Sequence, residues 1–172
     1  MRAPVGLAPL LFQGGDFFPA GEDLCLLGVG LRSNLAAALE LMRKDLLGTR
    51  RVAVVRDESD LSQDRMHLDC VFNIASDSVC LLFEGAMGDA PTRRLVDVYE
   101  RAGAGAQYAL KRESVEFGEF LHGEGYTIIP ITLEEQLAYG WYVLARACAP
   151  PSLRSSRACL RAVLAHTSMH FG

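Results

Sequence analysis

Short blocks of hydrophobic residues, separated by polar turns, run along the chain and predict the same order of elements twice. The first repeat is expected to contain a strand over 16–18, a turn over 19–22, a strand over 24–29, a helix over 34–47 and a strand over 51–55. The second is expected to contain a strand over 68–74, a turn over 76–78, a strand over 79–83, a helix over 92–101 and a strand over 126–131. The pattern therefore predicts an α/β fold built from two ββαβ units, with a long Gly-rich connection over 102–125.

The first helix has the clearest signals of any element. Apolar residues recur at three- and four-residue intervals from Leu35 to Leu46, which is the period of a helix with one buried face. Asn34, or Ser33 before it, can supply the N-cap, and Gly48 can end the helix.

A third unit begins at 132–144 and stops there. Two units and a stub are fewer than repeat folds need, so the sequence predicts that the chain is incomplete. The end of the chain differs in composition, because no acidic residue follows Glu135 and Ala, Arg, Ser, Leu and Cys dominate. We therefore divide the chain into a partial domain over 1–143 and a tail over 144–172. The tail is either a natural loop with a short helix or sequence unrelated to the preceding fold.

Composition narrows the possible partners. Of the 172 residues, 50% are hydrophobic and 22% are charged, which is the range of globular proteins. The formal net charge of −4 provides no basic field for nucleic acid and suits a cationic small molecule better. The chain has no apolar run of membrane-spanning length, and its N-terminus lacks the long apolar core of a signal peptide. We expect a cytoplasmic protein without nucleic-acid or membrane partners.

The segment RMHLDCVFNI, residues 65–74, places two polar residues inside an otherwise apolar strand. Alternate residues of a strand point to the same face, so His67 and Asp69 are expected to lie side by side while Cys70 points the other way. A buried carboxylate needs a partner, because burial without one costs several kcal/mol. The spacing alone also allows a wet strand end, in which case the pair has no special role.

The five cysteines follow no metal-ligand spacing. Cys25, Cys70 and Cys80 lie in apolar runs and are expected to be small core residues. We predict neither a metal ion nor a cofactor.

Three motifs carry a resemblance to a known superfamily: FQGGDFF at 12–18, LGVGLRSN at 27–34 and RMHLDCVFNI at 65–74. In this order and spacing they resemble the guanidine-modifying pentein enzymes, and most of all arginine deiminases and their amidinotransferase-like relatives. The resemblance covers about residues 10–143. It implies a five-bladed propeller of ββαβ units around a central active site. This chain would supply about two blades and the start of a third.

The resemblance also implies a mechanism and a set of roles. In these enzymes a cysteine thiolate attacks the guanidinium carbon, ammonia leaves, and water completes hydrolysis to a ureido group. His67 would be the general acid/base and Asp69 would hold the guanidinium, while Arg32 would bind the substrate carboxylate with a bidentate fork. Asp16, in the Gly-Gly-Asp turn, is assigned to substrate binding as well.

Three features depart from the family pattern, and the first is that the family's upstream guanidinium-binding acid would precede residue 1. Gln13 stands where the family usually has an acid that is hydrogen-bonded to the catalytic histidine. An amide can orient the imidazole but cannot stabilise its protonated form by charge, and Gln13 is kept as a catalytic candidate. The family nucleophile lies in a Gly-rich loop that neither Cys148 nor Cys159 matches, and Cys70 is expected to face away from His67. The chain is therefore expected to lack the nucleophile.

These features favour an arginine deiminase-like hydrolase that converts arginine to citrulline and ammonia. An amidinotransferase is the alternative enzyme, because no residue identified above selects water over an amine as the acceptor. A catalytically silent binding module is the alternative outside the enzymes. The expected partner is an arginine-like small molecule, and oligomer formation is left open.

Overall fold

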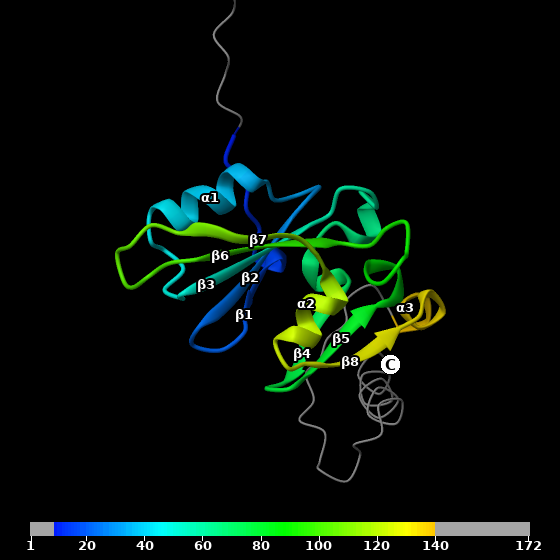
Figure 1. The fold of residues 1–172 in the computed structure, drawn as a ribbon. Helices are drawn as coiled ribbons and strands as arrows, with labels where there is room; N and C mark the ends of the chain where they lie inside the picture. Colours follow the sequence, from blue (N-terminus) through cyan, green and yellow to red (C-terminus); the bar gives the residue numbers. More distant parts are fainter. Residues whose placement is uncertain (1–8, 140–172) are drawn as a thin grey trace, which may run out of the picture.

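The computed structural model describes residues 9–139, which form two β-sheets with three α-helices (Figure 1). The five-stranded sheet has the order β1-β2-β3-β6-β7 and the three-stranded sheet has the order β4-β5-β8. The strands are β1 Phe17–Pro19, β2 Leu24–Val29, β3 Arg51–Arg56, β4 Phe72–Ser76, β5 Val79–Phe83, β6 Leu95–Glu100, β7 Ala109–Glu116 and β8 Thr127–Ile131. The helices are α1 Leu35–Arg43, α2 Phe117–Gly123 and α3 Leu133–Tyr139. The predicted mixed α/β fold is confirmed.

Each sheet contains three strands of the same topology. In the first unit β1 is antiparallel to β2, and β2 is parallel to β3. In the second unit β4 is antiparallel to β5, and β5 is parallel to β8. A helix precedes the last strand of each unit, α1 before β3 and α2 before β8. The repeat predicted from the hydrophobic pattern is therefore present in the strand pairing.

Strand β2 shows how the two units are joined. All six of its residues are buried, and successive side chains point to opposite faces of the sheet. Leu24 and Leu26 pack in a core with Phe72 of the second sheet and Phe117 of α2. The alternate residues of β2 pack on the other face, where α1 lies. One shared core therefore holds both units together.

The helix predicted over 92–101 is wrong, because most of this segment is strand β6. Val96 and Val98 alternate with more polar residues and point into the shared core, which is the period of a strand. β6 pairs antiparallel with β3 of the first unit and is followed by β7, an exposed edge strand inside the predicted connection 102–125. The helix of the second unit is α2, which also lies within that connection.

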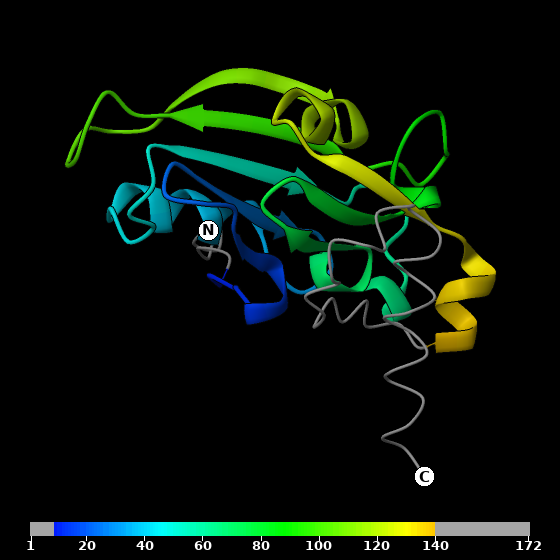
Figure 2. The ribbon, with the colours of Figure 1, turned by 90° about the horizontal axis from the view of Figure 1, so that it is seen from below.

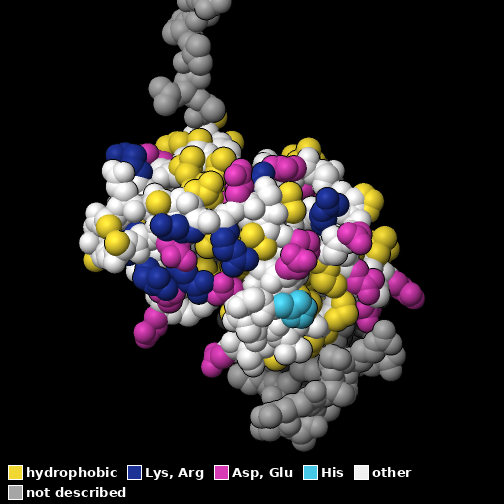
Figure 3. Space-filling model, viewed as in Figure 1, with side chains coloured by type: hydrophobic (Ala, Val, Ile, Leu, Met, Phe, Trp, Pro, Cys, Tyr) yellow, Lys and Arg dark blue, Asp and Glu magenta, His cyan; other side chains and the backbone are white. Residues whose placement is uncertain are grey.

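The N-cap of α1 is confirmed, whereas its expected length and buried face are not. The Asn34 side chain accepts a hydrogen bond from the Ala37 N–H at 2.9 Å, and the helix ends at Arg43. Leu35 and Leu39 are 39% and 42% exposed, and apolar side chains gather over α1 in Figure 3. The buried residues of the helix are instead Ala37, Ala38 and Met42.

The strand predicted over 68–74 begins late. Residues Leu68–Cys70 form a 3₁₀ turn, here called η3, and β4 starts at Phe72. The N–H of Leu68 donates to the carboxylate of Asp16 at 2.8 Å, so it is not available to a neighbouring strand. His67 is the extended residue just before this turn.

The predicted tail lies outside the described residues, with Cys148 and Cys159. Cys25, Cys70 and Cys80 are buried, as predicted. Within 9–139, no helix is long and apolar enough to cross a membrane.

Candidate active site

Two matching turns form the centre of the candidate site. Each unit begins with a 3₁₀ turn before its first strand: η1, Gly14–Asp16, in the first unit and η3 in the second. Gln13 precedes η1 and His67 precedes η3, and both residues have extended backbone. The two turns contact each other and lie side by side in Figure 2. Equivalent positions of the two units therefore meet at one place.

The side chains of Gln13 and His67 are joined directly. The imidazole Nε2 lies 2.5 Å from Gln13 Oε1. The N–H of Gln13 in turn donates to the Ser33 hydroxyl at 3.0 Å, which fixes the backbone of the turn. The amide holds the ring in one orientation without contributing charge.

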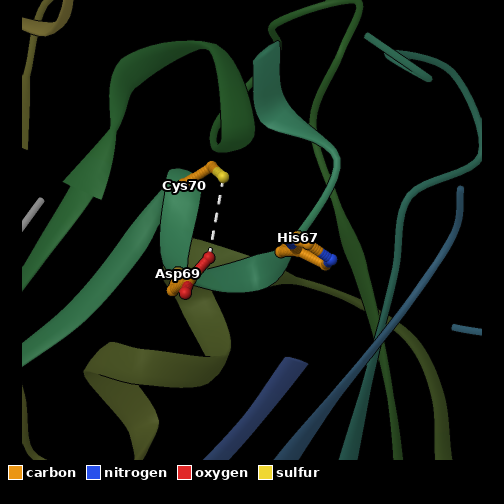
Figure 4. Close-up of side chains that lie close together, drawn as sticks. All are labelled: His67, Asp69 and Cys70. Carbon is orange, nitrogen blue, oxygen red and sulfur yellow. Dashed lines mark hydrogen bonds between the residues drawn. The ribbon is translucent and has the colours of Figure 1, made fainter. Parts of the chain in front are cut away.

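Asp69 lies on η3 next to the backbone of Gly15. A Cβ atom at Gly15 would be 2.8 Å from Asp69 Oδ2, so only glycine leaves room for this carboxylate. Oδ1 accepts a hydrogen bond from the Cys70 thiol at 3.6 Å (Figure 4). Asp69 and His67 are both half-buried. The carboxylate of Asp69 and the imidazole of His67 are therefore both accessible to solvent.

Asp16 has a structural position. It is 3% exposed, and its two oxygens accept hydrogen bonds from the Leu68 N–H and from the Ser33 hydroxyl at 2.6 Å. Burial raises the pKa of this carboxyl group above its usual value. Gly28 lets it approach, because a Cβ there would lie 2.5 Å from Asp16 Oδ1. Asp16 therefore fastens the two turns together instead of facing an open site.

Arg32 follows β2 and reaches the segment that leads to His67. Its Nε donates to the Met66 sulfur at 3.2 Å and its Nη2 donates to the Gln63 side chain at 2.9 Å. Arg32 is exposed, and it forms no ion pair with a described residue. Its guanidinium is thus hydrogen-bonded to two neutral side chains.

The expectation that Cys70 faces away from His67 is wrong. A ring nitrogen of His67, a carboxylate oxygen of Asp69 and the sulfur of Cys70 all lie within 4.8 Å of one another. This is possible because η3 is a turn, so its side chains do not alternate between two faces as they would on a strand. Cys70 is nevertheless a poor nucleophile. Burial raises the pKa of its thiol, and its S–H is donated to a carboxylate that disfavours the thiolate further. These three residues are also the described group that could hold a metal ion.

Two buried polar residues that support the site were not predicted. Arg94, 3% exposed, pairs with Asp57 at 3.1 Å and donates to the carbonyl of Arg65 at 3.0 Å. Gln136 of α3, 1% exposed, donates to the carbonyl of Cys70 at 2.9 Å. The sequence signal for Arg94 is its place directly before valines at alternate positions, which is the pattern of a strand and not of the helix predicted there.

A shallow cavity elsewhere shares no residue with this site. Arg51 lies in it and donates to Asp23 at 2.8 Å and to Glu124 at 2.6 Å. The charges of Arg51, Asp23 and Glu124 are thus paired within the protein, and the carboxylates of Glu22 and Asp77 also line the cavity.

Comparison with known proteins agrees with the motifs that meet in these turns. A family model of arginine deiminase matches residues 6–147. An arginine deiminase of Halobacterium salinarum (strain ATCC 29341 / DSM 671 / R1) is 30% identical over 157 residues, which cover 71% of this chain and 31% of the relative. The chain thus spans about a third of the length of that curated relative. It belongs to the arginine deiminase family.

Proposed function

We propose that this chain supplies the acid/base residue and the guanidinium-binding carboxylate of an arginine deiminase. The observation that carries the proposal is the pair of half-buried side chains on one turn, Asp69 as a carboxylate acceptor and His67 as a proton carrier, within a family match. The two units would be two blades of a propeller with these turns at its centre. Asp16 is left out of the proposed substrate contacts, because both of its oxygens are used within the protein.

Each side chain has a distinct task in this reaction. Asp69 would accept hydrogen bonds from the planar guanidinium, and Arg32 would hold the substrate carboxylate. A thiolate attacks the guanidinium carbon, and the C–N bond to the leaving nitrogen breaks as His67 gives that nitrogen its proton. Water, deprotonated by His67, then attacks the carbon and releases the thiolate and citrulline. Gln13 would keep the imidazole in the orientation that both proton transfers need.

The thiolate in this scheme does not come from the described cysteines. Cys25, Cys70 and Cys80 are buried, and burial raises the pKa of each thiol. The described residues therefore account for binding and proton transfer, and the nucleophile is assigned to a residue outside them.

Gly15→Ala should weaken arginine binding by about 10- to 150-fold, while Gly14→Ala should leave it within about twofold. The added methyl at Gly15 displaces the Asp69 carboxylate, which removes a charge-assisted hydrogen bond, whereas a Cβ at Gly14 meets no atom within 4 Å. Binding would be measured by calorimetry with L-arginine and with L-citrulline, which replaces the cation by a neutral ureido group.

The proposal requires arginine to bind more tightly than citrulline, and requires Gly15→Ala to remove that preference. Equal affinity for the two ligands, or equal effects of the two glycine substitutions, would show that Asp69 does not recognise a guanidinium. Folding of both variants would be checked by circular dichroism, so that loss of binding is separated from loss of structure.

A further inference from the structure

The turn η3 brings together three different metal-ligand types that the proposed reaction does not need in that combination. A nitrogen of His67, an oxygen of Asp69 and the sulfur of Cys70 lie within 4.8 Å of one another. In Figure 4 the thiol and the carboxylate face each other, and the imidazole is turned away from both. Two ligands of one tetrahedral zinc ion are about 3.3–3.8 Å apart, because metal–ligand bonds are about 2.0–2.3 Å long. The Cys70 sulfur and Asp69 Oδ1 are already 3.6 Å apart. The half-buried imidazole must turn toward them to complete the set.

The surroundings of these side chains are those of a supported ligand set. A metal-bound histidine usually donates its second N–H to an oxygen acceptor, and His67 Nε2 has Gln13 Oε1 at 2.5 Å, which leaves Nδ1 as the ligand atom. Gly15 allows Asp69 its position, and Gln136 holds the carbonyl of Cys70. The turn that carries the ligands is therefore fixed from two sides.

The charges and the ligand types select the kind of ion. A thiolate and a carboxylate together carry two negative charges and neutralise one divalent cation. Sulfur and imidazole ligands favour Zn²⁺ over Mg²⁺ or Ca²⁺, which prefer oxygen. On binding, the S–H bond of Cys70 breaks, the sulfur–metal bond forms and the proton passes to solvent. Three protein ligands at a half-buried site leave a fourth position for water.

We propose that His67, Asp69 and Cys70 bind a thiophilic divalent cation such as Zn²⁺, and that this ion competes with a guanidinium ligand for Asp69. The competition rests on the proposed function, whereas the binding of the ion does not.

Co²⁺ is the probe, because a thiolate ligand gives it a charge-transfer band in the near ultraviolet. The whole chain would be used with Cys148 and Cys159 replaced by serine, so that thiols outside the described residues cannot contribute. One Co²⁺ should bind with this band, and Zn²⁺ should displace it. The matched variant Cys25→Ser, at a buried thiol next to the Thr49 hydroxyl, should keep both the band and the affinity.

Cys70→Ser should abolish the band, and Asp69→Asn should keep the band but weaken binding by at least about tenfold. Asp69→Asn serves as the second variant because this half-buried side chain can change without disturbing the core. Absence of the band in the parent chain, or a band that persists in Cys70→Ser, would overturn the site.

Arginine binding in the presence of Zn²⁺ is a second, independent measurement. If both assignments hold, saturating Zn²⁺ should weaken arginine binding by at least about tenfold. Ion binding without any arginine binding would support the metal site and contradict the proposed function. Arginine binding without the cobalt band would support the proposed function and contradict the metal site. If the ion and arginine bind at the same time without affecting each other, the proposed competition is wrong.

Discussion

Replacing Arg94 by methionine should lower the free energy of unfolding by about 3–5 kcal/mol, because it leaves the buried carboxylate of Asp57 without its charged partner. Arg94 and Asp57 are 3% and 8% exposed, and their side chains are 3.1 Å apart. Burial lowers the pKa of Arg94, and nearby carboxylates oppose this change. Urea denaturation measures the effect. Arg93→Met, at the exposed neighbouring position, should change stability by no more than about 0.5 kcal/mol.

The double variant Arg94→Met/Asp57→Asn tests whether the unpaired charge of Asp57 causes this loss of stability. Neutralising Asp57 removes the unpaired buried charge, so the double variant should be more stable than Arg94→Met alone. A double variant that is equally or more unstable would show that the loss comes from packing and not from charge. Because Arg94 also holds the carbonyl of Arg65, we expect the path of the chain toward His67 to loosen in both variants.

Asp16→Ala should lower the free energy of unfolding by about 2–4 kcal/mol, because the Leu68 N–H and the Ser33 hydroxyl both lose a buried acceptor. Asp16→Asn keeps an acceptor oxygen for one of them and should cost less. Denaturation in urea at neutral pH compares the two. A control at the exposed Asp89, changed to alanine, should have little effect on stability.

The two Asp16 variants also differ in their dependence on pH. Burial raises the folded-state pKa of Asp16, so its contribution to stability is complete below the unfolded value of about 3.9 and is lost as the pH rises through the folded value. The asparagine has no proton to lose. The stability of Asp16→Asn relative to the parent chain should therefore improve as the pH rises above about 4. A decline over this range would mean that hydrogen bonding to the carboxylate outweighs the cost of burial.

The hydrophobic pattern predicted best where burial alone determines the structure. β2, β3, β5 and β8 are apolar strands of the shared core, and each lies where the blocks of apolar residues placed it. β7 was missed because it is an exposed edge strand, so its charged residues carry no apolar period.

Errors near the site came from contacts between distant parts of the chain. RMHLDCVFNI has the composition of a strand. The N–H of Leu68 is instead hydrogen-bonded to Asp16, and residues Leu68–Cys70 form η3. That hydrogen bond joins residues 52 positions apart, and no local pattern contains it. The contact between Gln13 and His67 is easier to predict from the sequence, because the two residues occupy the same place in the two repeats.

The hairpin of β6 and β7 is synthesised after the strand with which it pairs. β6 belongs to the second unit in sequence but completes the sheet of the first, where it pairs with the open side of β3. During synthesis on a ribosome, β3 emerges on the order of seconds before its neighbour exists. Over that interval an unpaired strand edge is available to other nascent chains. We therefore expect the first repeat to be prone to aggregation until the hairpin is complete.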